Sequence, residues 1–149
     1  MARERDVRSA IRDALVATGA FSDVWLTGLP EGFGQGASSL AAAAIEPLST
    51  RLADGWDAAP GGGLDYTAEI TVTLLARHPD PQLRDELAEQ LLNFLIDAVN
   101  GQSLAALTIP QHTMITSWRW LSPHPPERRI NATVGFSYIV TWDGFDTSA

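Results

Sequence analysis

The chain has 149 residues, the length of one ordinary domain, and with 45 % hydrophobic residues it can bury a substantial core. Its formal net charge of −8 and its ten basic residues, all arginine, argue against DNA binding by phosphate neutralisation, which needs a basic surface. The absence of cysteine excludes disulfides, thiolate metal sites and a cysteine nucleophile.

The N-terminal segment Arg3–Thr18 predicts an amphipathic helix, because its apolar positions repeat along one stripe. That stripe consists of Val7, Ile11, Ala14, Leu15 and Thr18. We expect Gly19 to end the helix at its C′ position. The N-terminus lacks the pattern of a signal peptide, and no apolar run approaches the about 20 residues of a membrane helix. We therefore expect a soluble protein that stays in the compartment where it is made.

A short strand is predicted for Phe21–Thr27, and a flexible glycine-rich loop for about residues 31–63. Within that stretch Leu40–Leu52 is ambiguous. Its alanines favour a helix, whereas Pro47 would break a helix, and Ile45–Leu52 could be an edge strand, which tolerates proline. We favour a strand for this segment.

The segment Leu64–Ala76 alternates between apolar and polar residues, with Leu75 as the exception, and predicts one strand buried on a single face. The apolar positions are Leu64, Tyr66, Ala68, Ile70, Val72, Leu74 and Ala76. At about 3.3 Å per residue the strand would span roughly 40 Å, which exceeds the usual strand length. A strand of this length outgrows its own core, so we expect it to contribute to an assembly.

The following segment predicts a long helix capped by Asp80, with Pro81 in the first turn. Its apolar stripe is Leu83, Leu87, Leu91, Phe94, Leu95 and Ala98. Asn100 and Gly101 are expected to end the helix, with Gly101 in the left-handed conformation.

Two further strands are predicted for Thr113–Leu121 and Arg129–Trp142, followed by a mobile polar tail at residues 143–149. In the last strand the residues on one face are Ile130, Ala132, Val134, Phe136, Tyr138 and Val140. The whole chain, residues 1–149, is therefore expected to be a single α+β domain. We expect a mostly antiparallel sheet with two helices packed on one face, a two-layer sandwich.

No residue pattern indicates a catalytic, metal-binding or cofactor site. The three histidines, His78, His112 and His124, have no metal-ligand spacing, and we expect His78 to donate to a turn carbonyl. The glycine clusters match neither a dinucleotide-binding loop nor a P-loop.

Aromatic residues are the remaining signal. Trp118 and Trp120 are expected on the same strand face as Met114, where core packing is the favoured role and an interface anchor the alternative. Trp56 and Phe33 lie in glycine-rich stretches and are better interface candidates. The full set of interface candidates is Phe33, Trp56, Trp118, Trp120, Trp142 and Phe145.

The run from Leu64 to Val140 contains YTAEITVTLLAR, then DP and a helix ending AVNG, then RINATVGFSYIV. Together with an N-terminal helix ending ALVATG, this order of elements resembles the tail terminator (tail completion) proteins of long-tailed phages. The resemblance covers most of the chain, except the stretch at residues 31–63.

The resemblance implies a structural virion protein without enzymatic activity, cofactor or membrane contact. It implies a homohexameric ring that caps the tail tube, ends tube polymerisation and joins the tail to the head connector. The implied partners are further copies of the chain, the tail tube protein and the head–tail connector or neck proteins. The particle would be assembled in the host cytoplasm.

DNA would pass through the pore of such a ring without specific binding, because a negative lining repels phosphates. The candidate pore-lining carboxylates are Glu31, Asp54, Asp57 and Asp65. Two alternatives stay open: another neck or head-completion protein, and a small α+β ligand-binding domain or enzyme.

Overall fold

The computed structural model describes residues 3–30, 39–52, 64–101, 104, 107–108, 113–121 and 127–140. The elements are α1 Arg3–Ala17, β1 Asp23–Trp25, β2 Leu40–Leu52, β3 Leu64–Arg77, α2 Pro81–Val99, β4 Met114–Leu121 and β5 Glu127–Val140. The fold is α+β, as predicted. Among the described helices, none has the length and apolarity needed to span a membrane.

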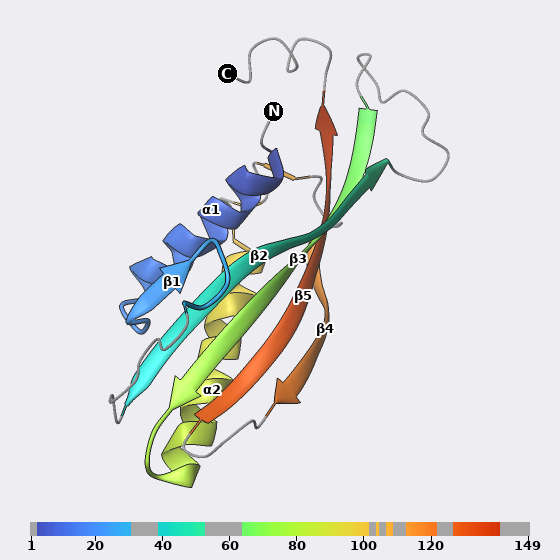
Figure 1. Cartoon of the computed structure of the whole chain (residues 1–149). Helices are drawn as coiled ribbons and strands as arrows, with labels where there is room; N and C mark the ends of the chain where they lie inside the picture. Colours follow the sequence, from blue (N-terminus) through green and yellow to red (C-terminus); the bar gives the residue numbers. More distant parts are fainter. Residues whose placement is uncertain are drawn as a thin grey trace.

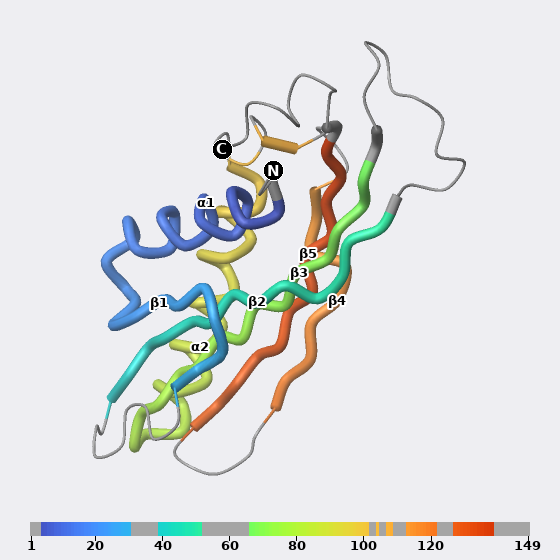
Figure 2. The backbone as a smooth tube through the Cα atoms, turned by 45° about the horizontal axis from the view of Figure 1, so that its top comes forward, coloured from blue at the N-terminus to red at the C-terminus, as the bar shows by residue number. Residues whose placement is uncertain are grey.

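The strands form one sheet in the order β1-β2-β3-β5-β4, and every neighbouring pair except β1 with β2 is antiparallel. β3 and β5 pair without a register shift from Leu64 opposite Val140 to Arg77 opposite Glu127. Figures 1 and 2 show α1 and α2 on the same side of this sheet. The predicted two-layer arrangement, with both helices on one face, is therefore confirmed.

The alternation of the long strands places the main core between the sheet and the helices. The side chains of this core that are at most 1 % exposed in β3 and β5 are Ala68, Ile70, Val72, Leu74, Ala76, Ile130, Ala132, Val134 and Phe136. α1 contributes Val7, Ile11 and Leu15, each fully buried. The apolar faces predicted from the sequence are thus the faces that the helices cover.

The ambiguous segment 40–52 is a strand along its whole length, which agrees with the favoured interpretation in type but begins five residues before the Ile45–Leu52 edge strand considered. Ala41, Ala43 and Ile45 belong to the main core, where small alanine side chains let the helix layer approach the sheet. β1 pairs with β2 only at Ala42, Ala43 and Ala44. Pro47 lies beyond this pairing, in a part of β2 with one neighbouring strand, where proline is tolerated.

Helix α2 begins as predicted. The Asp80 carboxylate accepts hydrogen bonds from the backbone N–H groups of Gln82 (2.9 Å) and Leu83 (3.3 Å), and Pro81 is the first helical residue. The prediction that Leu83 belongs to the buried stripe is wrong, since its side chain is 46 % exposed. It lies in the first turn, and the fully buried side chains of α2 begin only at Ala88.

The C-terminal ends of α1 and α2 differ from each other. Gly19 follows α1 with φ of +73°, the left-handed conformation expected for a C′ glycine. The same expectation for Gly101 is wrong, because its φ is not positive. The N–H groups of Asn100 and Gly101 instead donate to the carbonyls of Ile96 (3.1 Å) and Ala98 (3.2 Å), so the end of α2 needs no left-handed residue.

A second, smaller apolar cluster lies on the sheet face opposite the helices. It consists of Leu40, Ala42 and Leu75, with Trp25 and Leu29 packed against it. The cluster explains why Leu75 interrupts the alternation of β3, because at this end of the sheet both faces are covered. One apolar residue in a polar position therefore marks a local second layer.

Strand boundaries differ from the predictions by a few residues. β1 occupies Asp23–Trp25 within the longer predicted segment, and β5 begins at Glu127, two residues earlier than predicted. The predicted end of the last strand at Trp142, the tail and most of the 31–63 stretch lie outside the described residues.

Candidate assembly surfaces

Trp118 and Trp120 lie on β4, at the edge of the sheet, and are 47 % and 42 % exposed. They pair with Ala132 and Ile130, whose side chains are buried on the helix face. α2 packs mainly on β3 and β5, so it leaves this side of β4 partly uncovered. The favoured interpretation of core packing is therefore wrong for both tryptophans, and a role as interface anchors stays a prediction.

A β-bulge changes the face assignment within β4. The register shifts between Ile115, opposite Val134, and Ser117, opposite Thr133. The extra residue puts Ile115, and not Met114, on the face of Trp118. By strand register the expectation that Met114 shares this face is wrong, because the alternation rule assumes an uninterrupted strand; Met114, at the start of β4, still lines the groove described next together with Trp118.

A small groove separates the C-terminal end of α2 from the beginning of β4. Its volume is about 230 Å³, and its lining consists of Ile96, Val99, Asn100, Met114, Ile115 and Trp118. Small-molecule sites usually measure about 300–1,000 Å³. The groove is smaller and mostly apolar, so its size suits a single side chain better than a whole ligand.

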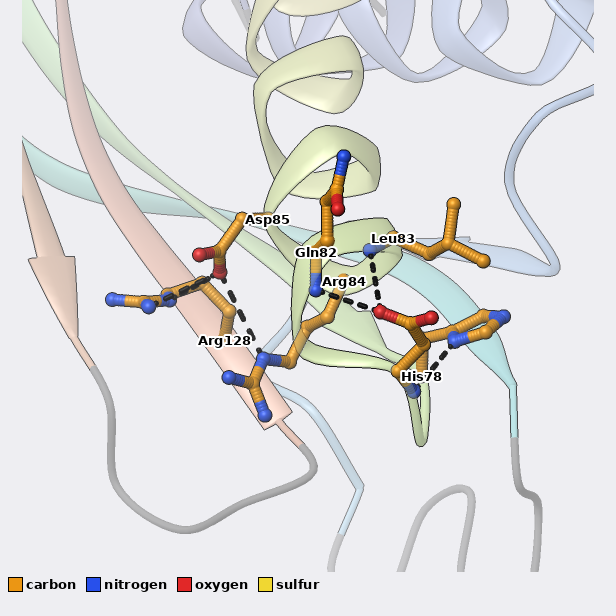
Figure 3. A network of polar contacts seen from close by, with 7 residues as sticks. His78, Gln82, Leu83, Arg84, Asp85 and Arg128 are labelled. Carbon is orange, nitrogen blue, oxygen red and sulfur yellow. Dashed lines mark hydrogen bonds and ion pairs between the residues drawn. The ribbon is translucent and has the colours of Figure 1, made fainter.

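Trp120 is connected to α2 through a chain of charged groups. The Arg128 guanidinium lies 5.7 Å from the centroid of the Trp120 ring, in cation–π geometry, and forms an ion pair with Asp85 at 3.1 Å. Asp85 also lies 3.8 Å from Arg84, whose Nε atom is buried (Figure 3). These contacts hold the N-terminal end of α2 against β5. They also place a positive charge beside the exposed indole of Trp120.

Glu127 forms a second ion-pair group where β3 ends and β5 begins. Its carboxylate contacts Arg77 and also Arg129, the latter at 3.2 Å. Burial raises the pKa of Glu127, but the hydrogen bond from Arg77 and the charges of Arg129 and Arg77 outweigh burial and lower it. The carboxylate is therefore held in its charged form and joins the ends of two neighbouring strands.

The side chain of His78 helps to form the turn before α2. The backbone N–H of Asp80 donates to Nδ1 of His78 at 3.0 Å, as Figure 3 shows. At Nδ1 His78 therefore accepts a hydrogen bond, and its donation to a turn carbonyl stays a prediction for the other ring nitrogen. In the part of the chain that the structure describes, no group of three or more His, Cys, Asp or Glu residues is placed to hold a metal ion.

The second half of β2 provides another open edge, on the opposite side of the sheet from β4. A register shift between Pro47 and Ser49 makes Leu48 a bulged residue, and its side chain is 56 % exposed. Glu46, which precedes Pro47 and pairs with Thr71, is also exposed. Sequence reasoning overlooked Leu48; the available signal was an apolar residue directly after a proline in an edge strand.

Most other predicted site residues lie outside the described residues. These are the interface candidates Phe33, Trp56, Trp142 and Phe145 and the pore candidates Glu31, Asp54 and Asp57. Only the backbone of Asp65 is described, in β3, where it pairs with Ile139. Of the predicted site residues, the structure thus brings together only Trp118 and Trp120, on the edge strand β4.

No protein-family model matches the chain, and no curated protein matches it in sequence. Among solved structures, it is similar to a chain in the structure described as the sheath/tube terminator, in the extended state, of an extracellular contractile injection system. The identity is 18 %, the TM-score is 0.46, and the match covers 91 % of this chain and 56 % of that one. This chain therefore spans little more than half of that protein.

A second similar chain belongs to the virion of a native gene transfer agent particle. Its identity is 16 % and its TM-score 0.37, with 93 % of this chain and 92 % of that chain covered. At these identities and TM-scores neither likeness carries a functional argument.

Proposed function

We propose that this chain is a structural protein of a phage-tail-like particle, and specifically its tail terminator. Copies of the chain would form a hexameric ring that caps the tail tube, ends tube polymerisation and joins the tail to the head connector. Its partners would be further copies of itself, the tail tube protein and the connector or neck proteins.

The observation that carries this proposal is the exposure of large apolar side chains at both edges of one sheet. Trp118 and Trp120 are exposed at the β4 edge, and Leu48 at the β2 edge. Two different surfaces on opposite sides of a subunit are suited to a head-to-tail contact. Such a contact forms a closed ring when the rotation between neighbouring subunits closes.

Closure of the ring also explains how the ring limits its own size. In a closed ring every edge that participates in the contact is occupied, so the assembly stops growing in that plane without any chemical step. The resemblance of the sequence to tail terminators supports a ring of six subunits and its position at the end of the tail tube.

The charge of the chain is consistent with a pore for DNA. A net charge of −8 produces a negative field, and a negative pore lining keeps the phosphate backbone from adhering. We assign the lining to the carboxylates of Glu31, Asp54, Asp57 and Asp65. Particle assembly would take place in the host cytoplasm.

Light scattering coupled to size-exclusion chromatography, followed by negative-stain imaging, tests the proposal. Six copies of the 16.1 kDa chain give a ring of about 97 kDa, formed by the chain alone or on purified tail tubes. A ring of twelve subunits would indicate a connector instead. A chain that stays monomeric at high concentration, also when tubes are present, would refute the proposal.

A further inference from the structure

The two open edges of the sheet carry apolar features of opposite shape. At the β2 edge Leu48 is bulged and 56 % exposed. At the β4 edge the α2–β4 groove, defined by the six lining residues given above, is apolar and has the volume of about one large side chain. One edge thus projects an apolar side chain, and the other offers a small apolar groove.

The charges at these edges are complementary as well. Glu46, two residues before Leu48, and Arg119, between the two tryptophans of β4, are both exposed. Among the described residues neither has an ion-pair partner. By register, Glu46 opposite Thr71 and Arg119 opposite Asn131 both lie on the sheet face away from the helices. A copy placed beside the sheet in the same orientation therefore brings opposite charges to the same face.

We propose that Leu48 of one copy inserts into the α2–β4 groove of the next copy, with Glu46 of the first copy facing Arg119 of the second. This contact rests on the proposed function, because it is the head-to-tail contact that a ring needs. The occupant of the groove is a second copy of this chain.

The direction of the strands fits this arrangement. Three antiparallel pairings separate β2 from β4 in the sheet, so these two strands run in opposite directions. A neighbouring copy in the same orientation would thus place its β2 antiparallel to β4, the commoner pairing of strands in sheets.

Pro47 and the bulge at Leu48 prevent a continuous ladder of hydrogen bonds along this part of β2. Insertion of a side chain, and not extension of the sheet, would therefore provide most of the contact. This restricts pairing to copies whose grooves align with Leu48, whereas a flat edge would pair with any exposed strand.

Cysteine cross-linking tests the contact directly, since the native chain contains no cysteine. The variants Leu48→Cys and Met114→Cys each carry one thiol, at the projecting side chain and at the groove. Mixed and oxidised, they should give a disulfide-linked dimer that reductant removes, because a disulfide needs Cα atoms within about 7 Å. Each variant alone should give no dimer, and the variant with both substitutions should give a ladder of linked copies.

Val16→Cys is the matched control, because Val16 is 57 % exposed but lies on α1. Mixed with Met114→Cys, it should give no dimer. A dimer from Met114→Cys alone would mean that two grooves face each other and would overturn the inference. So would equal cross-linking of Val16→Cys and Leu48→Cys.

Charge reversal provides a second test of the same contact. Glu46→Arg should weaken self-association at least about tenfold, and Glu46→Arg combined with Arg119→Glu should restore it, in sedimentation experiments at low salt. Failure of the double variant to restore association would overturn the pairing of the two charges.

These outcomes separate the inference from the proposed function. If the unmodified chain forms a hexameric ring and Leu48→Cys does not cross-link to Met114→Cys, the contact is wrong and the ring stands. If the unmodified chain forms no ring, either alone or on purified tail tubes, both are refuted.

Discussion

Truncation of Phe136 tests the division of the aromatic residues between core and surface. Phe136 is 1 % exposed in the middle of β5, and its ring stacks with Tyr138 at a centroid distance of 6.0 Å. Phe136→Ala should lower the free energy of unfolding by about 3–5 kcal/mol, because it removes buried area and leaves a cavity. Domains are stable by only about 5–15 kcal/mol, so the loss is a large part of the total.

Trp118→Ala is the matched comparison, since it removes an even larger aromatic side chain. Trp118 is 47 % exposed at the sheet edge, so only part of its area is withdrawn from water. Complete burial of a large apolar side chain is worth about 1.5–3 kcal/mol, and we therefore expect a cost of about 1 kcal/mol for the isolated subunit.

Urea denaturation followed by far-ultraviolet circular dichroism measures both costs without relying on tryptophan fluorescence. It should be carried out at a concentration at which light scattering finds only monomers, because association adds to apparent stability. The m-value should stay unchanged if the variants alter only the native state. A cost for Trp118→Ala equal to that of Phe136→Ala would refute the assignment of Trp118 to the surface.

Two further predictions concern the ends of the elements. Asp80→Ala removes the acceptor for two N–H groups at the start of α2 and should cost about 1 kcal/mol in urea denaturation, whereas Asp80→Asn should retain most of the stability. Equal losses for the two variants would contradict the capping role. Because the pKa of Glu127 is lowered in the folded state, its carboxylate stabilises the fold above its unfolded-state pKa, and this contribution is lost as the pH falls through the folded-state pKa. Unfolding free energies measured from about pH 6 down to about pH 3 should therefore fall less steeply for Glu127→Gln than for the unmodified chain, and equal slopes would rule out this role.

The candidate surfaces were only partly foreseeable from the sequence. The sequence predicts an interface anchor as one of two roles for Trp118 and Trp120, but a short strand has the same sequence pattern whether its sheet edge is covered or open. Leu48 was overlooked because a single apolar residue within an otherwise mixed strand has no pattern of its own. Its exposure follows from a bulge and from the shortness of β1, which pairs with only three residues of β2.

The local features of the fold follow from short stretches of the amino-acid sequence. The alternation in β3 and β5 specified which face is buried, the pair Asp80-Pro81 specified where α2 begins, and Gly19 specified where α1 ends. Each of these three features depends on residues within one or two helical turns or within one strand. Positions close together in the sequence are therefore enough to predict it.

Which strands lie at the edges of the sheet, and how far the helices cover them, depends on long-range contacts. The bulge in β4 separates Met114 from the face of Trp118, and the packing of α2 on β3 and β5 leaves both tryptophans exposed. These features arise from contacts between segments far apart in the chain. A local pattern of apolar residues is the same whether or not another layer covers it, and for this reason only the folded arrangement separates core from contact surface.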